Sequence, residues 1–260
     1  MRHFLPRLTG ALALSAIALL IGACNSSSSD NNNTTTQSAT GIWSGTDSVS
    51  GLTVTAFINS GGQATFIRSD GIQFTGAVQV SSSTLAASVD GYPDFAQDFS
   101  DGSTYGIGTL SGTVTTGGTL TATLAFTTNG NTSITGNWSL TYESLSDTTS
   151  SPSAFAGTYT DSASGATFTI TTGGAISITN SPNGCSLTGK VTTSDTTHNI
   201  YQVSYSYTGC TGTYQPLNGV QFTGLGTINS TLSPAQAVIA ATGTLNGDYF
   251  GIITTLTSTS

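Results

Sequence analysis

Apolar and polar residues alternate with a period near two from residue 41 onwards, and this alternation is typical of β-strands with one buried face. The clearest runs are residues 52–57 and 120–126. Clusters of glycine, asparagine, serine and aspartate separate the runs, and these residues favour the tight turns of β-hairpins. The pattern predicts an antiparallel meander of about eight strands between residues 42 and 143.

The same pattern then starts again, and short motifs repeat in the same order. Residues 47–51 read Asp-Ser-Val-Ser-Gly, and residues 161–165 read Asp-Ser-Ala-Ser-Gly. Three further matches are Gly76 with Gly189, Gly108 with Gly226, and Trp138 with Tyr249. All four pairs are separated by 111 to 118 residues, so we predict a tandem duplication of two all-β domains. Each repeat is long enough to bury a core of its own.

Eight meandering strands can close into a small up-and-down barrel or fold into a β-sandwich. We favour the barrel, because closure removes the free strand edges that otherwise pair with other chains. A closed barrel pairs its first and last strands, which predicts Trp43 and Trp138 on one seam. Tyr159 and Tyr249 would hold the corresponding places in the second domain. Residues 41–43, Gly-Ile-Trp, resemble the first-strand G-x-W motif of lipocalin-like barrels, and this resemblance implies a barrel shape alone.

Aromatic side chains at alternate strand positions are candidates for the barrel interiors. They are Phe57, Phe66, Phe74, Phe126, Phe168 and Phe222. The alternative is that some of them line a ligand cavity, because the many glycine and threonine residues leave room inside a barrel.

The beginning of the chain has the features of an export signal. After a short basic start, residues 8–21 form an uncharged, mostly apolar run that is shorter than a membrane span. Residues 21–24, Ile-Gly-Ala-Cys, resemble the lipobox of bacterial lipoproteins. The resemblance implies cleavage before Cys24, a covalent lipid on its sulfur, palmitate as an acyl group of the anchor, and anchoring to an envelope membrane. The alternative is a secreted protein whose first mature residue is cysteine.

The chain therefore divides into five predicted segments. They are a signal peptide (1–23), the lipidated Cys24 with a tether (24–40), a first β domain (41–146), a linker (147–155) and a second β domain (156–260). The tether is rich in serine, asparagine and threonine, so we expect it to be disordered.

The charge of the mature chain limits its partners. Without residues 1–23 only Arg68 and Lys190 remain against twelve acidic residues, which gives a net charge of −10. Nucleic-acid binding needs clustered basic residues and is therefore excluded. Electrostatic attachment to anionic lipid is excluded for the same reason, so the lipid anchor would be the contact with the membrane.

The number of cysteines is consistent with an exported protein. With Cys24 lipidated, Cys185 and Cys210 remain as a pair, and such pairs form disulfides in oxidising compartments. Two free buried thiols or a metal pair are the alternatives, but His198 is the only histidine left to complete a metal site.

One stretch departs from the strand pattern. Asp90, Asp94, Asp98 and Asp101 lie within twelve residues, and Tyr92 lies among them. Carboxylates with aromatic neighbours could bind Ca²⁺ or contact a small ligand or a sugar ring. The spacing matches no EF-hand loop, and the alternative is a solvated connection between two strands.

Catalytic motifs are absent from the sequence. No Gly-x-Ser-x-Gly segment is present, and His198 is most simply a surface residue at the start of a strand. A hydrolase with two carboxylates would need acidic residues to meet in one cleft. We therefore expect a protein that is not an enzyme.

The whole chain resembles the two-repeat, disulfide-containing lipoproteins of Gram-negative envelopes, which mostly carry no assigned activity. The lipobox, the similar openings of the two domains and the cysteine pair carry this resemblance. It implies a lipid anchor in the outer membrane, since Asn25 rather than aspartate follows the lipidated cysteine. We expect a binding or structural role in the envelope. The alternative is a ligand carrier or surface receptor for a small molecule, a glycan or a host protein.

Overall fold

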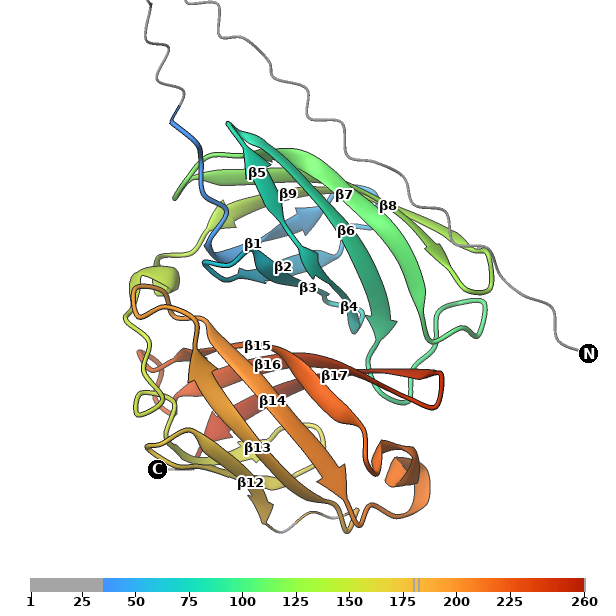
Figure 1. Cartoon of the computed structure of the whole chain (residues 1–260), viewed down its shortest axis with the longest axis vertical. Coiled ribbons are helices and arrows are strands. Elements are labelled where there is room, and N and C mark those ends of the chain that lie inside the picture. Colours follow the sequence, from blue (N-terminus) through green and yellow to red (C-terminus); the bar gives the residue numbers. More distant parts are fainter. Residues whose placement is uncertain (1–34, 180, 182, 260) are drawn as a thin grey trace, which may run out of the picture. The chain divides into compact units, whose positions relative to one another are not determined.

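The computed structural model describes residues 35–179, 181 and 183–259, and it is all-β apart from two short 3₁₀ helices (Figure 1). The 3₁₀ helices are η1 (Ser144–Asp147) and η2 (Gly212–Leu217). The predicted signal peptide, Cys24 and most of the predicted tether lie outside the described residues.

The first repeat is a closed barrel of eight strands. Its elements are β1 (Gly41–Asp47), β2 (Thr53–Ile58), β3 (Gln63–Arg68), β4 (Ile72–Ala77), β5 (Gln79–Ser81), β6 (Thr84–Pro93), β7 (Gly106–Val114), β8 (Thr119–Thr128) and β9 (Ser133–Tyr142). Neighbours in sequence pair antiparallel, and β1 pairs with β9. β4 and β5 both pair with β6 in one continuous register, so they act as a single strand interrupted at Val78.

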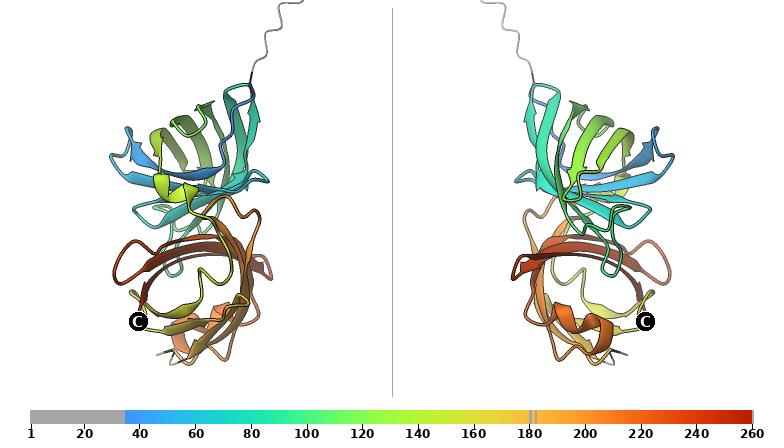
Figure 2. Two further views of the ribbon diagram at one scale, coloured as in Figure 1. Left: turned by 90° about the vertical axis from the view of Figure 1, so that its left-hand side faces the viewer. Right: turned by 90° about the vertical axis from the view of Figure 1, so that its right-hand side faces the viewer.

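The second repeat is also a closed antiparallel barrel, whose strands curve round into a ring in the side views of Figure 2. Its strands are β10 (Gly157–Asp161), β11 (Thr167–Ile170), β12 (Ala175–Thr179), β13 (Ser186–Thr193), β14 (Tyr201–Thr208), β15 (Gln221–Asn229), β16 (Gln236–Leu245) and β17 (Asp248–Ser258). The prediction of two tandem up-and-down barrels is confirmed, and the sandwich alternative is wrong.

Aromatic side chains fill the interior of the first barrel. Trp138 packs against Phe66 and Phe74 at ring-centroid distances of 5.2 and 5.8 Å, and Phe74 meets Phe126 edge-on at 5.2 Å. Five of the six predicted core phenylalanines lie inside a barrel. The exception is Phe57, which points outwards because its neighbours Ala56 and Ile58 face the core. Phe57 is nevertheless buried, against Ile42, Ile200 and Leu225.

The seam between first and last strands is as predicted for Trp43 and Trp138, since both lie on the β1–β9 pair. Tyr159 takes the place of Trp43 in the second barrel. The Trp43 indole donates to the carbonyl of Ala39 at 2.8 Å, and the Tyr159 hydroxyl donates to the carbonyl of Phe155 at 3.0 Å, in both cases four residues upstream.

The predicted place of Tyr249 is wrong. Tyr249 lies at the start of β17, opposite Thr244, whereas Ser258 at the end of β17 pairs with Tyr159. The match between Trp138 and Tyr249 failed because Gly247 occupies a hairpin turn, with φ of +92°, while Gly136 lies inside β9.

The motif at residues 47–51 and its repeat at residues 161–165 have the same structure in the two barrels. The backbone N–H of Asp47 bonds to the carbonyl of Leu52, and that of Gly51 bonds back to Asp47. Asp161, Gly165 and Ala166 form the same pattern. Gly51 and Gly165 have φ of +73° and +72°, a conformation that favours glycine, so each motif builds the same turn after the first strand.

Residues just before the predicted start of each barrel also pack against it. Ala39 at the end of the predicted tether is buried in the first core, and Gln37 donates its backbone N–H to the carbonyl of Ser82. Phe155 at the end of the predicted linker is fully buried in the second core. Neither end shows the period-two pattern of a strand, because Ala39 is a single apolar residue among polar ones and Phe155 lies in the short run Ala-Phe-Ala.

Residues 35–260 form one compact unit, within which the two barrels contact each other. The Gln73 side chain donates to the carbonyl of Ala241 at 3.3 Å, and the backbone N–H of Ile253 donates to the Asp94 carboxylate at 2.9 Å. A Cβ atom at Gly251 would come within 2.6 Å of the carbonyl oxygen of Pro93. Glycine is therefore required where β6 and β17 meet.

Candidate functional site: a cavity at the loop end of the second barrel

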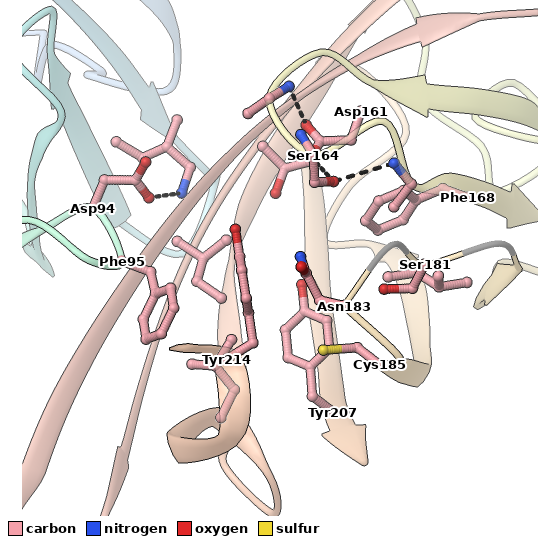
Figure 3. A pocket seen from close by; sticks show the side chains of 17 residues that line it. Asp94, Phe95, Asp161, Ser164, Phe168, Ser181, Asn183, Cys185, Tyr207 and Tyr214 are labelled. Carbon is pink, nitrogen blue, oxygen red and sulfur yellow. Dashed lines mark hydrogen bonds between the residues drawn. The ribbon is translucent and has the colours of Figure 1, made fainter. Parts of the chain in front are cut away.

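A cavity of about 100 Å³ lies at the end of the second barrel where the β10–β11, β12–β13 and β14–β15 loops meet (Figure 3). β17 contributes Ile252, Ile253 and Thr254 to its lining. Asp94 and Phe95 of the β6–β7 loop complete it, so residues from both repeats line one hollow.

The predicted disulfide joins Cys185 to Cys210, and Cys185 lines the cavity. The bridge ties the start of β13 to the β14–β15 connection. Asn218 strengthens this connection, since its side chain accepts from the backbone N–H of Cys210 at 2.8 Å and donates to the carbonyl of Cys210 at 2.9 Å. The covalent and hydrogen-bonded links hold the floor of the cavity in place.

Aromatic rings form the walls. Phe95 packs against Tyr214 with ring centroids 5.3 Å apart, and Phe168 and Tyr207 line the same space. Figure 3 shows Asp94 and Phe95 on one side of the hollow and Phe168 on the other. Burial, and next the charge of Asp161, raise the pKa of Tyr207 well above its usual range, so its hydroxyl stays protonated.

Two carboxylates line the cavity. Asp161 accepts from the backbone N–H of Ser164 at 2.9 Å and from its hydroxyl. Asp94 is partly buried, and its carboxylate accepts hydrogen bonds from the backbone N–H groups of Ile253 and Phe95. Burial, and to a smaller extent the charge of Asp161, raise the pKa of Asp94 above its usual value although the amides act in the opposite direction.

A tyrosine hydroxyl lies deeper in the same barrel. Tyr205 precedes Tyr207 by two positions on β14, so both rings face the interior. The Tyr205 hydroxyl is buried and has no hydrogen-bond partner among the described residues. Its pKa is raised by burial first, and then by Tyr207 and Asp94, which places it within electrostatic reach of both.

The predicted acidic stretch is divided among several environments. Asp90 accepts from the Tyr105 hydroxyl at 2.5 Å, and Asp101 accepts from Ser103 and Thr128. Asp98 is exposed. Within the described part of the chain, no three Asp, Glu, His or Cys side chains come together as metal ligands would.

Tyr92 from the same stretch is buried away from the cavity. Its ring packs against Tyr105 and Tyr249, whose own rings are stacked at 3.9 Å. Burial, and next the charge of Asp90, raise the pKa of Tyr92 to about 12. Tyr92 therefore belongs to the contact between the barrels, and only Asp94 of the predicted loop residues lines the cavity.

His198 lies beside Asp195 and Thr197, but the three do not form a catalytic triad. Its Nδ1 is 2.9 Å from the Thr197 hydroxyl and 3.2 Å from Asp195 Oδ1. A triad base uses one ring nitrogen for the nucleophile and the other for the carboxylate, whereas here a single nitrogen meets both. The arrangement is that of a surface turn.

The sequence contains no signal for most of the cavity. In the sequence, Asp161 belongs only to a repeated turn motif, and Phe95 is simply the residue that follows Asp94. Tyr207 and Tyr214 lie on either side of Cys210, so the predicted disulfide was the one clue that this region is held rigidly.

The chain matches no protein-family model, and no curated protein is significantly similar to it. In the described residues, no helix has both the length and the apolar character needed to cross a membrane.

Proposed function

We propose that the protein is a non-enzymatic outer-membrane lipoprotein that holds a small ligand at the loop end of its second barrel. The observation that carries this proposal is the partly open cavity lined by Asp94 and Phe95 from one repeat and by the disulfide-tied loops of the other. Concave sites with a largely apolar lining and a few placed polar groups are typical of ligand binding. Of the two functions that the sequence favours, this geometry supports the carrier over a purely structural role.

The first barrel is the better candidate for a structural role. Phe66, Phe74, Phe126 and Trp138 pack against one another across its interior and leave it filled. We propose that this barrel supports the β6–β7 loop that completes the cavity. The size of the cavity limits the ligand to a small molecule or to the end group of a larger one, since an engineered cavity of about 150 Å³ holds benzene.

The lipid anchor has a direct test. Cells supplied with radiolabelled palmitate should label the wild-type protein, and Cys24→Ser should remove both the label and the membrane association. Cys185→Ser is the control that should keep the label. An unlabelled wild-type protein would contradict the anchor. Proteinase K added to intact and lysed cells would then distinguish a surface location from a periplasmic one.

Binding in the cavity can be tested with small fragments, using ligand-observed NMR. Ala163 lies on the exposed rim, so Ala163→Trp should block the cavity while the barrel stays folded. Ser162→Trp is the matched control, because Ser162 is exposed on the same loop and is not part of the lining. We expect fragments that bind the wild type and Ser162→Trp but lose binding to Ala163→Trp. The proposed site would be refuted if fragments bound Ala163→Trp as well as the wild type, or if no fragment bound the wild type.

A further inference from the structure

We infer that the ligand of this cavity is a small organic cation, an amine with a short apolar body, whose charge meets the Asp94 carboxylate. The inference rests on the proposed function, since it assigns a chemical class to the ligand of the same cavity. The carboxylates Asp94 and Asp161 line a hollow to which the described residues contribute no Lys, Arg or His.

Among the described residues, neither carboxylate has a cationic partner. The ion pairs in the described part of the chain are Arg68 with Asp70 and His198 with Asp195. Asp161 is satisfied by its own turn, through the backbone and hydroxyl of Ser164. Within the part of the chain that the structure describes, Asp94 receives hydrogen bonds from neutral backbone donors, so its charge is the one that a ligand would neutralise.

A carboxylate in this position is unfavourable for the unliganded protein. Burying a charge without a counter-ion costs free energy, and burial raises the pKa of Asp94 accordingly. The neutral amide of an asparagine would accept the same hydrogen bond from Ile253 without that cost. A carboxylate that weakens the free protein is consistent with a functional position, where stability is commonly given up for binding.

The rest of the lining suits an organic cation better than a metal ion. Phe95, Phe168, Tyr207 and Tyr214 present aromatic rings, and a cation near the face of such a ring is attracted by its quadrupole. Ca²⁺ requires six to eight oxygen ligands, whereas much of this lining is apolar. The chain carries a formal net charge of −8, and −10 without residues 1–23, which would also attract cations and repel anions.

Three isosteric probes separate charge from shape. Isobutylamine, isobutanol and isobutyrate have nearly the same size, and their affinities for the full-length Cys24→Ser protein can be measured by titration NMR at pH 7. We expect the amine to bind at least about 10-fold more tightly than the alcohol, and the acid not to bind. Equal affinities for amine and alcohol would overturn the cation class but leave the binding site standing. If these probes and the fragments all fail to bind, both the cation class and the proposed function are wrong.

The variant Asp94→Asn tests whether the carboxylate of Asp94 binds the amine. We expect amine affinity to fall at least about 30-fold with alcohol affinity unchanged, since removing one partner of a desolvated charge pair has effects of this order. Asp98→Asn removes the same charge from an exposed position on the same loop and should change amine affinity less than about 3-fold. Unchanged amine binding in Asp94→Asn, or an equal loss in Asp98→Asn, would refute the role of Asp94.

The thermal stability of the free variant provides a second readout. Asp94→Asn should melt at a higher temperature than the wild type at pH 7, because it removes a poorly compensated charge and keeps the bond from Ile253. A merely structural carboxylate would give the opposite result, a lower melting temperature, and that outcome would overturn the inference.

Discussion

Replacing Asp47 by alanine should destabilise the first barrel by about 3–5 kcal/mol. Asp47 is fully buried, and its carboxylate accepts from the backbone N–H groups of Val49 and Asn137 at 3.0 and 2.9 Å and from the Ser50 hydroxyl at 2.7 Å. Alanine leaves three donors without their acceptor in a place that water reaches poorly. Urea unfolding followed by tryptophan fluorescence measures the effect, since Trp43 and Trp138 are the only tryptophans and both lie in the first barrel.

Two variants serve as controls for this prediction. Asp161→Ala removes the equivalent carboxylate from the second barrel, so it should shift the tyrosine near-ultraviolet signal and leave the tryptophan transition nearly unchanged. Asp98→Ala is exposed and should stay within about 0.5 kcal/mol of the wild type. An Asp47→Ala protein as stable as Asp98→Ala would show that the carboxylate contributes little.

The effect of Asp47 should also depend on pH. Burial raises the pKa of Asp47, but the hydrogen bonds from Ser50, Asn137 and Val49 outweigh burial, so its pKa lies below the ordinary value of 3.8. A lowered pKa means that the carboxylate contributes its full stability above pH 3.8 and loses it as the pH falls through the lowered value. The difference between wild type and Asp47→Ala should therefore shrink in acid, and a constant difference would contradict this account.

Removing the disulfide should destabilise the second barrel by about 3–4 kcal/mol, through the loop entropy of an unfolded chain that is no longer cross-linked. The double variant Cys185→Ala with Cys210→Ala tests this in urea, with tyrosine circular dichroism as the signal for the second barrel. Because Cys185 lines the cavity, amine binding should weaken together with stability.

A reductant supplies the matched control for the disulfide. It should destabilise the wild type by a similar amount and leave the double alanine variant unchanged, while the tryptophan transition of the first barrel stays in place. A reductant effect of equal size on the double variant would mean that the change does not come from this bridge.

The fold was readable from the sequence because its signals are local. Period-two alternation marks the strands, and turn residues such as Gly51 and Gly165 separate them. Tight turns between successive strands leave an antiparallel meander as the simplest topology. The match of Trp138 to Tyr249 failed because a glycine near an aromatic residue is a short signal in a chain with 32 glycines. Such a signal does not distinguish a strand from a turn.

The site was readable only in part, because its residues meet through tertiary structure. Asp94 stands out within a run of aspartates, but nothing near it in sequence indicates that it would line the same cavity as Asp161 and Tyr214. This placement depends on β6 meeting β17, where Gly251 permits the close approach of Pro93. A glycine that allows contact between two barrels has no local pattern to distinguish it from a glycine in a strand.

The pairing of β1 with β9 and of β10 with β17 has a consequence for how the chain folds. Trp43 pairs with Tyr142 and Tyr159 with Ser258, so each ring is completed by strands about 100 residues apart. Such distant pairings raise the contact order and slow folding into the millisecond-to-second range. During that time an incomplete ring offers two unpaired strands to any neighbouring chain. A holdase chaperone that covers them should therefore raise the folding yield, most of all at high expression.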